Sequence, residues 1–111
     1  MAGVIPSAQA FRAAELITPA DHGIASRVLA KTAGGNVTLF AFDAAEGLSE
    51  HTAPFDALVL VLEGALNLTV GDTAVAAPEG TIVRLPAQVP HSVEAVSASK
   101  MLLIMLREPK A

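Results

Sequence analysis

Glycine and proline break this sequence at short intervals, and the runs between the breaks are rich in Val, Ile, Leu, Thr and Phe. β-Branched and aromatic residues favour strands, whereas glycine and proline mark turns. Several short strands separated by turn signals are typical of a β-sandwich or β-barrel. The pattern therefore predicts an all-β fold. The breaks fall at Pro19, Gly23, Gly34, Gly35, Gly47, Pro54, Gly64, Gly71, Gly80, Pro86 and Pro90.

Eight strands are predicted from these runs, and Gly71 with Asp72 forms a tight hairpin turn between two of them. The segment 7–16, SAQAFRAAEL, fits either a short helix or an irregular first strand, because its pattern matches neither period. The predicted strands lie near 24–30, 36–43, 57–63, 65–70, 73–77, 81–85, 91–97 and 100–107.

The composition is that of a globular chain with one core. The sequence has 111 residues, of which 52% are hydrophobic and 16% charged, which excludes a disordered chain. We predict a single domain over 1–111, with an N-terminal arm over 1–20 and a barrel over 24–107.

Two strands are apolar on both faces: ALVLVL at 57–62 and MLLIML at 101–106. In a half-buried strand one face is polar, so each of these strands needs a cover on both sides. The opposite sheet supplies one cover, and a second copy of the chain is the expected source of the other. We therefore predict a homodimer; the alternative is a local cover by the N-terminal segment.

Charge and composition argue against several other classes of partner. The net charge is -4, and the seven Lys and Arg residues are scattered singly, so we expect no nucleic-acid binding. The apolar runs are far shorter than the roughly 20 residues of a membrane-spanning helix, so we expect no membrane insertion. The N-terminus does not resemble a signal peptide and there are no cysteines, so a cytoplasmic location is expected.

Two segments resemble the two sequence motifs of the cupins, a family of small jelly-roll barrels. The segment 51–64 reads HTAPFDALVLVLEG, and the segment 80–91 reads GTIVRLPAQVPH. The first cupin motif has His-x-His, a Glu three or four residues on, and a Gly after six more. The second has a Gly, five residues, Pro-x-Gly, two residues, a His, and an Asn four positions on. The matching positions are His51, Gly64, Gly80, Pro86 and His91.

This resemblance covers roughly 24–107 and implies the cupin-type double-stranded β-helix, a jelly-roll barrel. It says less about activity, because one fold hosts many functions. Two of the four metal ligands that it implies remain, namely His51 and His91. The departures are Ala53 at the second histidine, Ala57 at the glutamate, Gln88 at the second glycine and Ala95 at the asparagine.

The two remaining histidines raise the question of a metal. Imidazole suits Zn, Mn, Fe, Ni or Cu, but catalytic sites usually have three protein ligands. We therefore expect either a weakly held divalent ion on His51 and His91 or no metal. Asp56 is a candidate third ligand because it adjoins position 57. Side-chain alternation points it to the other face, unless a bulge near Pro54 redirects it.

The same positions define a candidate ligand pocket. We expect His51 and His91 to point into the barrel mouth, where Ala53 and Ala57 leave more apolar space than histidine and glutamate would. The structural alternative is a pair of histidines that line the barrel and have no chemistry.

Four other polar side chains have plainer interpretations. Glu50 and Glu94 are expected to be solvated acids, and His22 to be an exposed loop residue. Arg84, the one charge in TIVRL, either anchors a ligand carboxylate or pairs with an acid at a sheet edge, which is the favoured interpretation.

Four functions follow from these patterns. The first is a module that binds a small molecule near His51 and His91. The second is a metal-dependent enzyme, similar to cupin dioxygenases or isomerases. The third is a metal-free enzyme with a histidine base, against which the absence of tyrosine counts, since such cupins pair the base with a tyrosine acid. The fourth is a purely structural dimer. No catalytic residue is assigned by the sequence.

Overall fold

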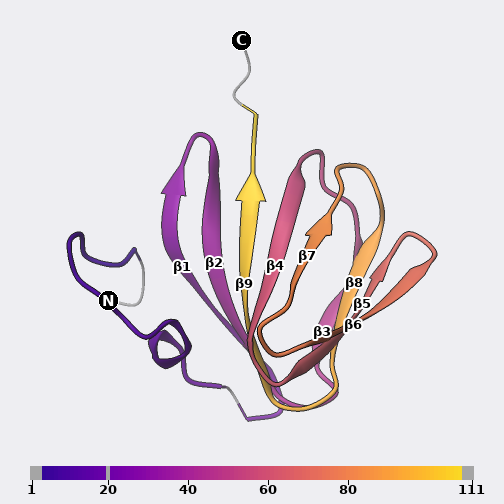
Figure 1. The fold of residues 1–111 in the computed structure, drawn as a ribbon, viewed down its shortest axis with the longest axis horizontal. Helices are drawn as coiled ribbons and strands as arrows, with labels where there is room; N and C mark the ends of the chain where they lie inside the picture. The colour runs from indigo at the N-terminus through magenta and orange to yellow at the C-terminus, as the bar shows by residue number, and fades with distance from the viewer. Residues whose placement is uncertain (1–3, 20, 109–111) are drawn as a thin grey trace.

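The computed structural model describes residues 4–19 and 21–108, which form nine strands and one short 3-10 helix (Figure 1). Strands dominate because the chain alternates short β-favouring runs with glycine and proline turns. The elements in chain order are η1 (Ala13–Leu16), β1 (Ile24–Thr32), β2 (Gly35–Phe42), β3 (Gly47–His51), β4 (Asp56–Glu63), β5 (Ala65–Val70), β6 (Thr73–Pro78), β7 (Ile82–Leu85), β8 (His91–Ala95) and β9 (Ser99–Leu106).

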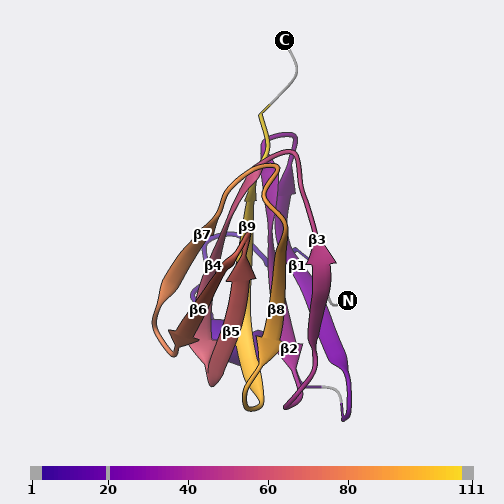
Figure 2. The same ribbon diagram turned by 90° about the vertical axis from the view of Figure 1, so that its right-hand side faces the viewer.

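The strands form two antiparallel sheets, whose arrangement can be followed in Figures 1 and 2. One sheet has five strands in the order β1-β2-β9-β4-β7, and the other has four in the order β3-β8-β5-β6. The last strand, β9, pairs with both β2 and β4, and β3 pairs with β8, so most partners are distant in sequence. This is the jelly-roll fold that the sequence predicted.

The sequence missed one strand, β3. Its residues, GLSEH, are short and polar, and none of them is buried. A strand without a buried face has no apolar alternation to reveal it. The undecided segment 7–16 contains the 3-10 helix η1 over Ala13–Leu16, so it is not a first strand.

The core lies between the sheets and follows the alternation of β4. Ala57, Val59 and Val61 are buried in it, whereas the intervening leucines are only partly buried. Phe42 of β2 and Met101 of β9 are fully buried in the same cluster. Each sheet therefore gives one apolar face to the interior, as a two-layer fold requires.

The outer face of the five-stranded sheet is covered in part by the N-terminal segment. Lys100 Nζ donates to the Ala14 carbonyl oxygen at 2.6 Å, and an Arg27 guanidinium N–H donates to the Leu16 carbonyl oxygen at 3.1 Å. The local cover that the sequence analysis gave as the alternative to a dimer therefore exists in part. It does not extend to Ile82 on the edge strand β7, which is 58% exposed and faces outward beside Leu60.

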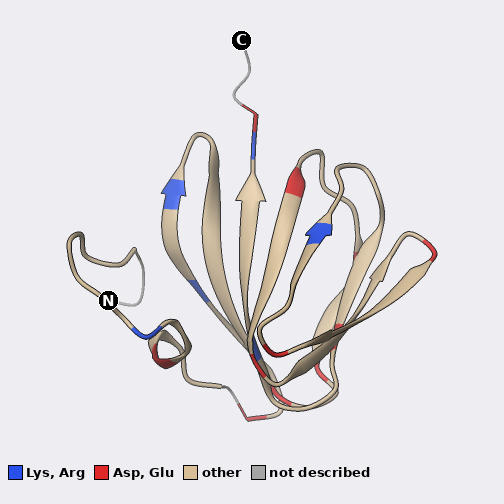
Figure 3. Ribbon diagram, in the orientation of Figure 1, with Lys and Arg blue, Asp and Glu red and all other residues tan. Residues whose placement is uncertain are grey.

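Charged residues are spread over several strands and loops of the described chain, as Figure 3 shows. The absence of nucleic-acid binding stays a prediction. Among the described residues there is no helix long and apolar enough to cross a membrane.

Gly64 and Gly80 offer a test of the turns. Both have left-handed backbone, with φ of +77° and +84°. A Cβ at Gly64 would overlap the Ala98 carbonyl oxygen, whereas a Cβ at Gly80 would meet nothing within 4 Å. We expect Gly80→Ala to lower the free energy of unfolding by about 1 kcal/mol, from the backbone conformation alone, and Gly64→Ala to lower it by more than about 3 kcal/mol. Urea denaturation measures both, and equal losses would contradict this account.

Candidate functional site

His51 and His91 meet across two neighbouring strands. His51 is the last residue of β3, His91 is the first of β8, and they are paired in register. Their rings cross edge to face at 72°, with centroids 4.3 Å apart. The two Nε2 atoms are 3.0 Å apart. The two motif histidines, 40 residues apart in sequence, therefore form one site.

An irregularity in β3 creates this pairing. Leu48 pairs with Val93, so a regular antiparallel ladder would place Glu50 opposite His91. The register instead shifts between Leu48 and His51, and His51 takes that place. A β-bulge is one additional residue in one strand of a pair, and it redirects the side chains that follow. The bulge therefore leaves Glu50 exposed and brings His51 to its partner.

The backbone determines which ring nitrogen of each histidine bears a hydrogen. His51 Nδ1 is 2.9 Å from the Ser49 carbonyl oxygen, and His91 Nδ1 is 3.3 Å from the Val89 carbonyl oxygen. A carbonyl oxygen only accepts, so both contacts place the hydrogen on Nδ1. In two neutral rings, both Nε2 atoms are then left as acceptors, 3.0 Å apart. Neutral imidazole nitrogens of this kind are the form that binds metal ions.

The two histidines differ in their surroundings. His91 is buried, with 6% of its surface exposed, whereas His51 is exposed. Burial lowers the pKa of His91 below its usual value, the neighbouring His51 lowers it further, and the Val89 carbonyl acts in the opposite direction. His91 is therefore held in the neutral form, which is the form that binds metals.

The two alanines of the predicted pocket occupy different places. Ala57 is 4% exposed and belongs to the core cluster, so it packs against other side chains. Ala53 is partly buried in the loop between β3 and β4, and its carbonyl oxygen accepts a hydrogen bond from Gln88 N–H at 2.8 Å. Two hollows of the described surface, one beside Phe55 and one at the β1–β2 turn, are not lined by these alanines or by the histidines.

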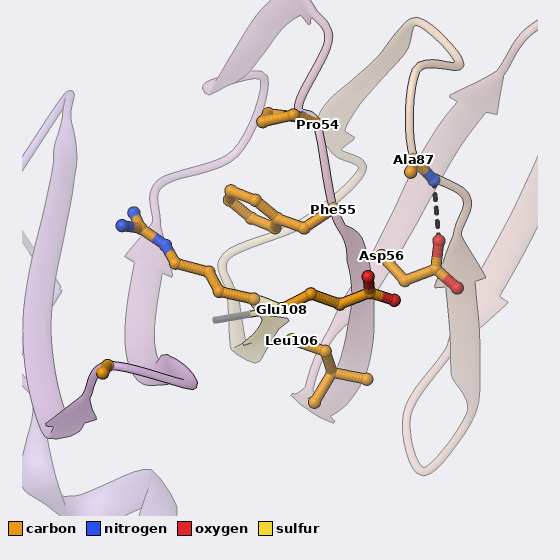
Figure 4. A pocket seen from close by; sticks show the side chains of 8 residues that line it. Pro54, Phe55, Asp56, Ala87, Leu106 and Glu108 are labelled. Carbon is orange, nitrogen blue, oxygen red and sulfur yellow. Dashed lines mark hydrogen bonds between the residues drawn. The ribbon is translucent and has the colours of Figure 1, made fainter. Parts of the chain in front are cut away.

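Asp56 lies with Arg84 rather than with the histidines. Its carboxylate accepts hydrogen bonds from an Arg84 guanidinium N–H at 2.9 Å and from Ala87 N–H at 2.8 Å. The Ala87 hydrogen bond, followed by that of Arg84, lowers the pKa of Asp56. Figure 4 shows Asp56 and Phe55 leaving the strand on opposite sides, as alternation predicts. The favoured interpretation of Arg84, an edge residue paired with an acid, is confirmed.

The described residues contain no group of three or more His, Cys, Asp or Glu side chains that could hold a metal ion. Asp56 therefore does not complete a set with the two histidines. Glu50, Glu94 and His22 are exposed, as the sequence predicted.

The sequence did not assign a role to Gln88, which joins the two loops behind the histidines. Its backbone is left-handed, with φ of 64°, at the position where the family motif has glycine. Its N–H donates to Ala53, so the loop that follows His51 is tied to the loop that precedes His91. The signal was the departure from glycine, but only the structure shows that the turn is kept.

A family model, the cupin domain, matches residues 38–107. The chain belongs to the cupin family. It is therefore a small conserved-barrel protein, as the two motifs indicated. No curated protein matches the sequence at a significant level.

Solved structures of other proteins have the same fold. A conserved protein of unknown function from Streptococcus pyogenes is 28% identical, with a TM-score of 0.89 over 96% of this chain and 93% of that one. A cupin superfamily protein from Desulfitobacterium hafniense is 27% identical, with a TM-score of 0.88 over 94% and 95%. A cupin 2 conserved barrel domain protein from Leptotrichia buccalis is 35% identical, with a TM-score of 0.81 over 85% and 46%. These names specify no reaction.

The lowered pKa of His91 predicts how the stability of this cupin depends on pH. The unfolded chain takes up a proton near the ordinary value of 6.5, before folded His91 does. This contribution to stability is complete above that pH and is lost as the pH falls through the folded-state pKa. We expect metal-free wild type to lose more stability than His91→Gln between about pH 8 and pH 5. Urea titrations measure the difference.

His22→Gln serves as the comparison variant, because His22 is exposed and lies beside Asp43, away from the histidine pair. It should keep the larger loss of stability that burial of His91 predicts. A difference between wild type and His91→Gln that is the same at every pH would contradict the assigned burial effect.

Proposed function

We propose that this cupin holds a divalent transition metal between His51 and His91 and binds a small molecule at that ion. The main support is the pair of Nε2 atoms, 3.0 Å apart, which are left as acceptors because both Nδ1 atoms lie against backbone carbonyl oxygens. The same carbonyl contacts are a common way for proteins to orient histidine ligands.

The donor atoms fit such an ion in type and spacing. Imidazole nitrogens bind Zn at about 2.0–2.1 Å, so two of them on a tetrahedral ion lie roughly 3.3 Å apart, a little more than the 3.0 Å between these Nε2 atoms. Neutral imidazole also suits Mn, Fe, Ni and Cu. Burial keeps His91 neutral, so little protonation energy opposes binding near neutral pH.

The number of protein ligands is lower than in most catalytic sites, which have three. The ion is therefore weakly held, and water or an oxygen of the bound molecule completes its coordination. A bound ion would act as a Lewis acid toward that oxygen. His51 is exposed, so the site opens to solvent on its side. A metal-free pair is the competing state, in which the two histidines bind the small molecule without an ion.

Metal titration tests the proposal. We expect metal-free protein to bind one Zn, Mn, Ni or Cu ion per chain by isothermal titration calorimetry. His51→Ala and His91→Ala should each weaken binding by more than about tenfold, because each removes one of two ligands. Asp56→Ala is the matched control and should leave the affinity unchanged, because that carboxylate is bound to Arg84. Equal binding in the His51→Ala/His91→Ala double variant would contradict the site.

We also propose a homodimer through the outer face of the five-stranded sheet. The support is the apolar stripe made by Ile82, Leu60 and Leu102, which are register partners on β7, β4 and β9. Leu60 and Leu102 are partly exposed, and Ile82 is largely exposed beyond the N-terminal cover. Aligned apolar side chains of this kind often mark an interface. The cytoplasmic location expected from the sequence stays a prediction.

Sedimentation equilibrium tests the dimer. We expect Ile82→Glu to weaken self-association by at least about tenfold, because two buried, unpaired carboxylates would face each other across a two-fold axis. Ile82 is exposed in the single chain, so its folding should be little changed. Val96→Glu is the matched control, because Val96 is 57% exposed and lies outside the stripe. A monomeric wild type would contradict this interface.

A further inference from the structure

A hollow on the described surface is separate from the histidine pair. It has a volume of about 1120 Å³ and lies where the β1–β2 turn, the loop before β4, the loop after β7 and the end of β9 meet. Ligand pockets commonly measure about 300–1,000 Å³, so a small organic molecule fits with space for water. The lining residues are Ala33, Pro54, Phe55, Asp56, Ala87, Leu106, Arg107 and Glu108 (Figure 4).

Arg107 is held in position at this hollow. Its guanidinium carbon lies 5.1 Å from the centre of the Phe55 ring, in a cation–π contact. Its backbone N–H donates to the Gly34 carbonyl oxygen at 2.7 Å. Within residues 4–19 and 21–108, the guanidinium has no carboxylate partner. An arginine stacked on a ring still presents a fork of N–H donors that matches a carboxylate.

The two acids in the lining have different electrostatic effects. Asp56 is compensated, because it forms an ion pair with Arg84 and accepts a second hydrogen bond from Ala87. Glu108 is exposed and forms no ion pair with another described residue. Arg107 is thus the one cation among the lining residues. The negative charge of Glu108 weakens the attraction of Arg107 for an anion, but the two side chains form no ion pair.

The remaining wall is apolar. Pro54, Phe55 and Leu106 project from the strand ends that border the hollow in Figure 4, and Ala33 and Ala87 complete the lining. A ligand that fits has an apolar body against these side chains and one negative charge toward Arg107. Pockets of this composition orient a ligand with a few polar groups and bind it through apolar contact.

We propose that this hollow is a binding site for small organic carboxylates with an apolar body, with Arg107 binding the carboxylate and Phe55 positioning Arg107. None of the lining residues is a histidine of the metal site. The two sites share loops, since Pro54 and Phe55 follow His51 and Ala87 precedes His91. Binding in the hollow requires no metal.

Titrations of metal-free protein with phenylacetate, phenethylamine and phenethyl alcohol test this site. Two-dimensional amide NMR reports where each probe binds. We expect phenylacetate to bind most tightly and to shift the amides of Ala33, Phe55, Ala87 and Leu106. Arg107→Gln should weaken phenylacetate binding by about tenfold, the scale of one charge-assisted hydrogen-bonded pair.

Glu108→Gln should act in the opposite direction and tighten phenylacetate binding several-fold, because it removes the nearby negative charge. Phe55→Leu should weaken binding while keeping an apolar wall. Arg12→Gln is the matched control, because Arg12 is an exposed arginine paired with Glu15 outside the hollow. The site would be overturned if phenethylamine bound as tightly as phenylacetate, if Arg107→Gln had no effect, or if phenylacetate produced no saturable shifts. These results do not depend on whether the histidines hold a metal.

Discussion

The pairing of the last strand with two earlier ones holds the barrel together. β9 lies at the centre of the five-stranded sheet, between β2 and β4, and its Met101 is fully buried. Until β9 is in place, neither neighbour has its inner hydrogen-bonding partner. Long-range antiparallel pairings of this kind carry a large loop-closure cost, which burial of the common apolar core offsets. The rest of the architecture depends on this central position.

The end of β3 and the start of β8 then position the two histidines. The bulge in β3 exchanges Glu50 for His51 opposite His91, and the backbone carbonyls of Ser49 and Val89 orient the rings. Gln88 links the loops behind both histidines through the Ala53 carbonyl. A small cost in backbone conformation at Gln88 thus maintains a turn on which the site geometry depends.

Two charged residues near the start of β4 and the end of β9 have different partners. Asp56 is tied to Arg84 and Ala87, so it stabilises the junction of β4 and the β7–β8 loop. Arg107, in a cation–π contact with Phe55, has no such acid among residues 4–19 and 21–108, and it lines a hollow. Among the described residues, an arginine with an ion-pair partner and one without therefore lie close to the same strand end.

The sequence alone determined the fold class, because alternating apolar runs and glycine or proline turns specify strands, and two motifs specified the cupin barrel. It also indicated that the side chains of Asp56 and Ala57 point to opposite faces of the sheet, because side chains alternate along a strand. It could not find β3, whose five residues bury nothing, nor show that Ala57 is packed into the core.

Only the tertiary structure decided that the two histidines face each other through Nε2 and that Arg107 lies over Phe55. Both depend on a register shift and on strand ends that are remote in sequence, which residue spacing does not encode.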